Sequence, residues 1–141
     1  MATYDESIRS ITLDADATLA GYTGVPGLPG SASPNSGKQY RFVKVTGAHQ
    51  CGVASAAANE IVIGVVQNKP QVTGAAATVA IRGISLVEAG GSVSAGNAVK
   101  VDANGKGVAA TLPADAALVV GVAVGGAASG QLVPVLLRLG A

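Results

Sequence analysis

Two stretches of this chain repeat one pattern of aliphatic runs broken by glycine, and this repeat narrows the possible folds more than any other feature. Each copy, at residues 60–83 and 117–140, has a valine-rich run interrupted by a glycine, a turn of small residues, and a second apolar run that ends in arginine. The turn glycine (Gly74 or Gly130) precedes that arginine by eight residues in both copies. Apolar β-branched runs bounded by glycine are typical of paired β-strands. The pattern therefore predicts an internal duplication of a strand-turn-strand unit and an architectural role.

The inventory of side chains also favours sheets over helices. The 141 residues include 20 glycines and one phenylalanine, and tryptophan is absent. A core built from small β-branched side chains packs well on a pleated surface. Short apolar runs recur between turn residues, and Asn104-Gly105 is a strong hairpin signal. We therefore expect an all-β fold, a small β-barrel or sandwich of about eight or nine short strands.

The first 37 residues differ from the rest of the chain. They contain a Gly/Pro-rich stretch that cannot bury much of itself, so it must be disordered or lie on something else. The sequence therefore predicts an extended N-terminal arm over residues 1–37 and a β-barrel domain over residues 38–141. We expect the sizeable apolar side chains of the arm to dock on a partner or an adjacent protomer: Tyr4, Ile8, Ile11 and Leu13.

Charge and cysteine content exclude several classes of protein. Nine basic and eight acidic residues are scattered singly, so no basic stripe is present to bind nucleic acid. The single cysteine cannot form an internal disulfide, and the start of the chain lacks the apolar core of a signal peptide. Glycine and proline divide residues 107–137 into strand-length pieces, so no membrane span is expected. We expect the chain to be made in a reducing cytoplasm. Because it is nearly neutral and apolar, we also expect partner proteins to cover its surface.

The residues suited to catalysis or metal binding are few. His49 and Cys51 lie two residues apart, a spacing that puts both side chains on one face of a strand. A zinc site needs more ligands than one histidine and one cysteine supply. Asp102 and Asn104 begin like a calcium loop but lack its closing acidic ligand. The sequence therefore predicts no enzyme, no metal site, no cofactor and no small-molecule substrate.

Arg82 and Arg138 occupy matching positions in the two copies of the repeat. They either form symmetric salt bridges at a subunit contact or extend from the strand ends into solvent. Both interpretations remain open, and both residues are candidate contact residues.

Several short motifs follow one another in order between residues 60 and 139. They are Ile63-Gly64-Val65-Val66, Ala95-Gly96-Asn97-Ala98-Val99-Lys100-Val101, Val120-Gly121-Val122-Ala123, Ser129-Gly130 and Val133-Pro134-Val135-Leu136-Leu137. In this order and spacing the segment resembles the capsid cement, or head decoration, proteins of tailed bacteriophages. The resemblance covers a little over half of the chain, and its motifs are structural.

The resemblance implies a structural virion protein with a specific position. It implies a small β-barrel, made in the host cytoplasm, that assembles as a homotrimer on the outer surface of an icosahedral head. There it binds the major capsid protein and stabilises the head by bridging neighbouring subunits. A capsid contact made by the N-terminal arm is our own inference, and we expect deletion of residues 2–20 to weaken head binding while the barrel stays folded.

A different class of binding module is the alternative. Carrier-like β domains present a lysine at a hairpin tip, and Lys106 lies beside the predicted Asn104-Gly105 turn. A bacterial surface repeat, unrelated to capsids, would also fit the composition.

Overall fold

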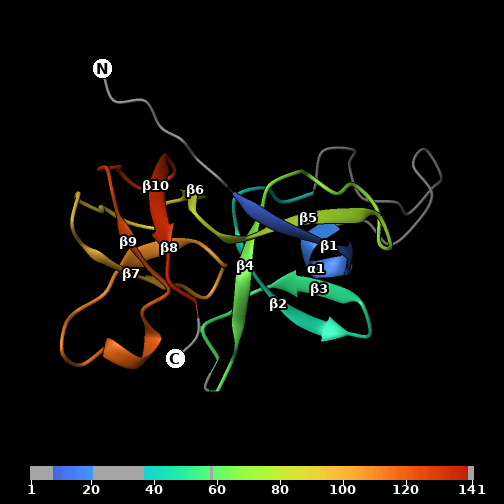
Figure 1. The fold of residues 1–141 in the computed structure, drawn as a ribbon, viewed down its shortest axis with the longest axis horizontal. Coiled ribbons are helices and arrows are strands. Elements are labelled where there is room, and N and C mark those ends of the chain that lie inside the picture. The colour runs from blue at the N-terminus through green and yellow to red at the C-terminus, as the bar shows by residue number, and fades with distance from the viewer. Residues whose placement is uncertain (1–7, 21–36, 58, 140–141) are drawn as a thin grey trace.

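The computed structural model describes residues 8–20, 37–57 and 59–139, which form an almost entirely β fold (Figure 1). The strands of this part of the chain are β1 (Arg9–Ala15), β2 (Phe42–Gly47), β3 (Gln50–Val53), β4 (Val62–Val66), β5 (Ala76–Arg82), β6 (Ile84–Glu88), β7 (Ala98–Val101), β8 (Gly107–Ala109), β9 (Gly121–Ala123) and β10 (Leu132–Leu137). Two short helical segments accompany them, α1 (Ala17–Ala20) and a 3-10 turn (Ala116–Leu118). The predicted all-β fold class is confirmed.

The strands are divided between a closed barrel and a second sheet. The barrel has the order β1-β3-β2-β4-β5, and the five-stranded sheet has the order β6-β10-β9-β7-β8. Only Gly83 separates β5 from β6, and its φ of 101° belongs to a region that glycine enters readily. The chain therefore turns a corner at Gly83 and passes from the barrel, on the right of Figure 1, into the sheet on the left.

The first strand corrects the predicted boundary between arm and barrel. β1 pairs antiparallel with β5 along its length, and its last residues, Asp14 and Ala15, pair in parallel with β3. Residues 9–15 therefore close the barrel, because β5 and β3 offer backbone partners far away in sequence. Because deletion of residues 2–20 would remove β1 from the barrel, the pairing argues against the expectation that the barrel stays folded without these residues. α1 also belongs to the barrel, because its Leu19 and Ala20 are buried in the barrel cluster. Residues 1–7 and 21–36 lie outside the described residues, and for them the extended arm stays a prediction.

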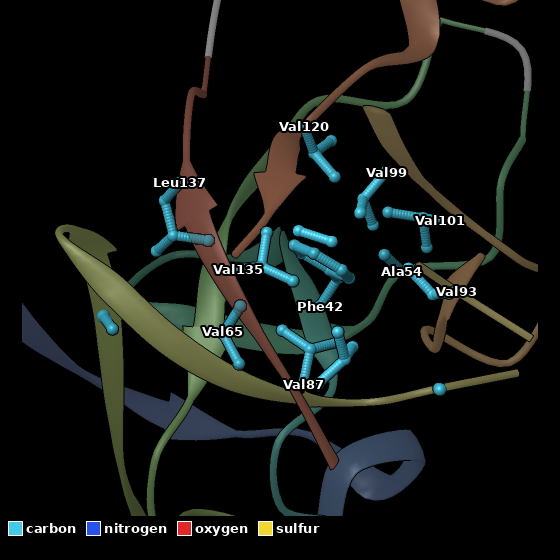
Figure 2. Packing of buried hydrophobic residues seen from close by; sticks show 14 residues of the cluster. Phe42, Ala54, Val65, Val87, Val93, Val99, Val101, Val120, Val135 and Leu137 are labelled. Atoms are coloured by element: carbon cyan, nitrogen blue, oxygen red, sulfur yellow. The ribbon is translucent and has the colours of Figure 1, made fainter. Parts of the chain in front are cut away.

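One hydrophobic cluster joins the barrel to the second sheet. Figure 2 shows Val87, Val99 and Val135 of the sheet gathered around Phe42 of the barrel, which is the only phenylalanine in the chain. A second cluster fills the barrel itself and includes Leu19, Val43, Cys51, Val66 and Val79. Because nearly all of these side chains are small and aliphatic, the strands pack closely, as the composition predicts.

The two copies of the repeat form hairpins with the same register. In the first copy, β4 and β5 are antiparallel and Val65 is paired with Ala80. In the second copy, β9 and β10 are antiparallel, and the equivalent residues Val122 and Leu136 are paired. This correspondence supports the internal duplication, which stays a prediction about the origin of the two units.

The interrupting glycine has the same packing role in each copy. A Cβ on Gly64 would overlap the carbonyl oxygen of Ala80 and lie 2.7 Å from Cγ1 of Val79. A Cβ on Gly121 would lie 2.6 Å from the carbonyl oxygen of Leu136, the residue equivalent to Ala80. Both glycines therefore let the backbones of adjacent segments approach more closely than a side chain would allow.

The hairpin between β7 and β8 fastens the second sheet to the barrel. Its tip residue Gly105 accepts a hydrogen bond from the amide of Phe42 (2.8 Å). Nearby, Nε of Arg41 lies 2.7 Å from the Glu88 carboxylate, which also lies 3.2 Å from Nζ of Lys106. Burial alone would raise the pKa of Glu88, but the hydrogen bonds and charges of Arg41 and Lys106 outweigh it and hold the pKa below 4.5. The ion pairs therefore stabilise the junction only while Glu88 is ionised.

We expect Gly64→Ala and Gly121→Ala each to lower the free energy of unfolding, by about 1–3 kcal/mol, because the added methyl group is forced into occupied space. Gly126→Ala is the matched control, since a Cβ there would meet its nearest atom, the carbonyl oxygen of Val93, at 3.4 Å. Urea unfolding of the three variants measures the effect. Equal stability of all three would contradict the packing role of the two repeat glycines.

We expect Glu88→Gln to destabilise the protein at pH 7 and to have a smaller effect at pH 3. A carboxylate whose pKa is lowered by folding stabilises the folded state above its unfolded pKa, and it loses that contribution as pH falls through its folded pKa. Because the folded pKa of Glu88 lies below 4.5, the difference between wild type and variant should shrink over that acidic range. Thermal unfolding at both pH values measures it, and a difference that is unchanged at pH 3 would contradict the argument.

Candidate interaction surface

The apolar residues of the predicted arm take different positions. Ile8 precedes β1 and Ile11 lies within it, with exposed fractions of 38% and 40%. Leu13 is half-buried and packs against the barrel cluster, so its main role is in the core. Tyr4 lies outside the described residues. The partner contacts expected of these four residues stay predictions.

Three exposed arginines lie at the junction of the barrel and the second sheet. Arg82 ends β5, and Arg138 follows β10; the two adjoin because the amide of Leu137 donates to the carbonyl of Gly83 (2.9 Å). Arg9 is the direct cross-strand partner of Arg82. Among the described residues, none of the three guanidinium groups forms an ion pair. The structure thus brings Arg82 and Arg138 together, and it places Arg9 beside them. Arg9 was not predicted from the sequence, because residue 9 was assigned to the N-terminal arm.

The second sheet has an apolar outer face beside these arginines. Along β10, Val133, Val135 and Leu137 are buried, so the alternating residues point away from the core. Their cross-strand neighbours on β6 and β9 are aliphatic except Glu88, which is the partner of Leu132 and is ion-paired with Arg41 and Lys106. We call this set the apolar sheet face: Ile84, Leu86, Val122, Val124, Leu132, Pro134 and Leu136. Four of its members are 41–44% exposed, and it contains no charged side chain.

Sequence analysis also missed the apolar sheet face. An uninterrupted aliphatic run such as residues 132–137 is typical of a strand that is covered on both sides. In this structure the described chain covers one side only. The apolar run at residues 132–137 therefore indicated that both sides of the strand need cover. Because the residues on both sides are apolar, the sequence does not show which side the rest of the chain leaves exposed.

His49 and Cys51 do not form an activated pair. Cys51 is fully buried on β3, whereas His49 is exposed, with a φ of 55°, in the turn between β2 and β3. Burial raises the pKa of the Cys51 thiol to about 11, and the nearby charges of Asp16 and Asp14 add to this effect. The thiol therefore stays protonated at neutral pH, which is the opposite of what a nucleophile requires.

The hairpin near residue 104 is occupied by its own contacts. One carboxylate oxygen of Asp102 accepts the amide hydrogens of Asn104 (2.8 Å) and Lys106 (2.9 Å), as in an ordinary turn. Lys106 is half-buried and ion-paired with Glu88, and Gly105 packs against the barrel. The tip is therefore held against the protein, which disfavours the carrier-like alternative, since that role needs a freely presented lysine.

A second apolar region is a groove of about 480 Å³ beside the 3-10 turn. Ile61 and Leu118 line it and are 76% and 56% exposed. Its one charged lining residue, Glu60, is already bound to Lys44 (2.7 Å) and to Ser55. The groove therefore offers aliphatic contact area and no free polar group for chemistry.

Within residues 8–20, 37–57 and 59–139, no three histidine, cysteine or acidic side chains gather in a way that would hold a metal ion. The described helices are all too short to cross a membrane.

Comparison with known proteins gives a likeness to a solved structure. The chain matches no family model and no curated protein. A crystal structure of the N base of head fiber gp8.5 in bacteriophage phi29 is similar to it, with 23% sequence identity and a TM-score of 0.58. The match covers 93% of this chain and 94% of the other. The two chains therefore share one fold over nearly their whole lengths.

We expect Cys51 in the folded protein to react very slowly with a thiol reagent at pH 8. A pKa near 11 leaves about a hundredfold less thiolate than a thiol with a pKa of 9.0, and burial restricts access further. His49→Cys in a Cys51→Ala background is the matched control, because it places a thiol on the adjacent exposed turn. Equal modification rates for the two thiols in folded protein would contradict the assignment of Cys51 to the core.

Proposed function

We propose that this protein is a structural component of a bacteriophage virion that binds the outside of the head. In this proposal it stabilises the head by bridging major capsid subunits, and it does so as a homotrimer. The observation that carries the proposal is the shared fold with a phage head fiber base, over 93% of this chain and 94% of that one. The order of the strand motifs, which resembles that of head decoration proteins, supports the same assignment independently.

The physical character of the surface agrees with a binding role. The described surface includes an apolar sheet face, an apolar groove and three arginines without ion partners. Its candidate nucleophile, Cys51, is buried with a raised pKa. A protein that stabilises a shell acts through many copies, each of which contributes a modest interface. Exposed aliphatic patches on a rigid β framework suit such an interface.

Co-sedimentation tests the proposal. We expect the purified chain to bind heads of its own phage that were prepared without it, with a saturable number of copies per head and greater resistance of the heads to heat. A heat-unfolded sample of the same chain serves as the control for nonspecific adsorption. Heads that take up no protein, or that take it up without saturation, would contradict the proposal.

A further inference from the structure

We propose that Arg9, Arg82 and Arg138, together with the apolar sheet face, form one docking surface for an acidic patch on a different protein. This inference rests on the proposed function, in which that protein is the capsid subunit, and it names the surface that makes the contact.

The arginines and the apolar sheet face are continuous. The amide of Arg138 donates to the carbonyl of Val120 (2.9 Å), so the pairing of β10 with β9 extends beyond the strand end. By alternation, Arg138 therefore lies on the same face as Leu136. Leu136 is in turn paired with Ile84, which follows Arg82 by two residues. The positive charges thus border one end of the aliphatic face.

The local arrangement is unfavourable in the isolated chain. Arg9 and Arg82 are direct cross-strand partners, and like charges in that position repel each other. The remaining arginine, Arg41, is ion-paired, as are Lys44, Lys100 and Lys106. The described carboxylates in these pairs are therefore used elsewhere, and within the described part of the chain the three arginines have no acidic partner. An acidic partner would remove the repulsion.

A second copy of the chain does not supply that acid from the described residues. Asp16 and Asp102 accept backbone hydrogen bonds, and Glu60, Glu88 and Asp115 are ion-paired. Of the described carboxylates only Asp14 makes no side-chain hydrogen bond or ion pair, so one copy offers a single free carboxylate to three arginines. Asp5 and Glu6 lie outside the described residues, and the experiment includes them.

The apolar sheet face favours a protein partner over nucleic acid. Phosphates would pair with the arginines but leave the leucines uncovered, and the described face has no aromatic side chain on which bases could stack. Protein interfaces, in contrast, combine a desolvated apolar centre with arginine. The chemistry points to a partner surface with aliphatic side chains beside clustered aspartate or glutamate.

The first experiment compares variants in binding to heads that lack the protein. We expect the double variant Arg82→Glu/Arg138→Glu to bind about tenfold more weakly or worse at low salt, because rim charges set association and its salt dependence. Leu86→Ser/Leu132→Ser should also weaken binding. Lys69→Glu, a single charge reversal at an exposed site on the β4–β5 connection, should bind like wild type. Circular dichroism checks that each variant is folded.

The second experiment is independent of heads, so the two proposals can fail separately. Amide NMR shifts are followed while hexaglutamate, or a short single-stranded DNA, is added to the labelled protein. We expect hexaglutamate to shift residues 9, 82–84 and 136–138 in wild type and in Lys69→Glu, but not in Arg82→Glu/Arg138→Glu.

Three results would overturn the docking surface. They are equal binding of all variants to heads, hexaglutamate shifts that are absent or located elsewhere, and tighter binding of DNA than of hexaglutamate. Self-association of the wild type that is lost in both Asp5→Asn/Glu6→Gln and the double arginine variant would assign the surface to a second copy instead. If the wild type fails to bind heads but hexaglutamate shifts the named residues, the proposed function fails and the acidic docking surface stands.

Discussion

The packing around Phe42 is the interaction on which the rest of the structure depends. Its ring lies in the cluster shared by the barrel and the second sheet. Its backbone amide binds the β7–β8 hairpin tip, and its carbonyl accepts the amide of Ala54 (2.9 Å). One residue therefore connects a barrel strand, a distant hairpin and the common core. Phe42 is the largest fully buried side chain among the described residues, and it joins two sheets whose other core residues are mostly valine and alanine.

The parts of the fold that sequence analysis could predict are those decided by local chemistry. The run near residue 62 forms β4, and Asn104-Gly105 forms the predicted turn. β1 was beyond such reasoning, because its partners in β5 lie more than sixty residues away and its own residues alternate only weakly. The arginine cluster could not be predicted either, since its members come from three segments that are far apart in the sequence. Arg82 and Arg138 could be chosen by their matching positions in the repeat, whereas nothing in the sequence around Arg9 connects it to them.

The use of charge divides the molecule into two regions. Ion pairs such as Arg41–Glu88 and Lys44–Glu60 lie where loops meet strands, and they stabilise the fold. In the described part of the chain, the exposed end of the second sheet has cations without anions and aliphatic side chains without cover. The ion pairs and the proposed docking surface therefore use different residues. If that surface binds a partner, substitutions in it can weaken binding and leave the ion pairs of the fold intact.

The position of β1 in the barrel has a consequence for the order of events during synthesis. The chain emerges from the ribosome with its N-terminus first, so Arg9–Ala15 are available long before their partners on β5, which ends at Arg82. The barrel cannot close until that later strand has been made and has folded back. Contacts between residues so distant in sequence form slowly, because a large loop must be ordered first. β1 is thus synthesised before the other described strands but is among the last to be enclosed, and until then its edge stays open to other chains.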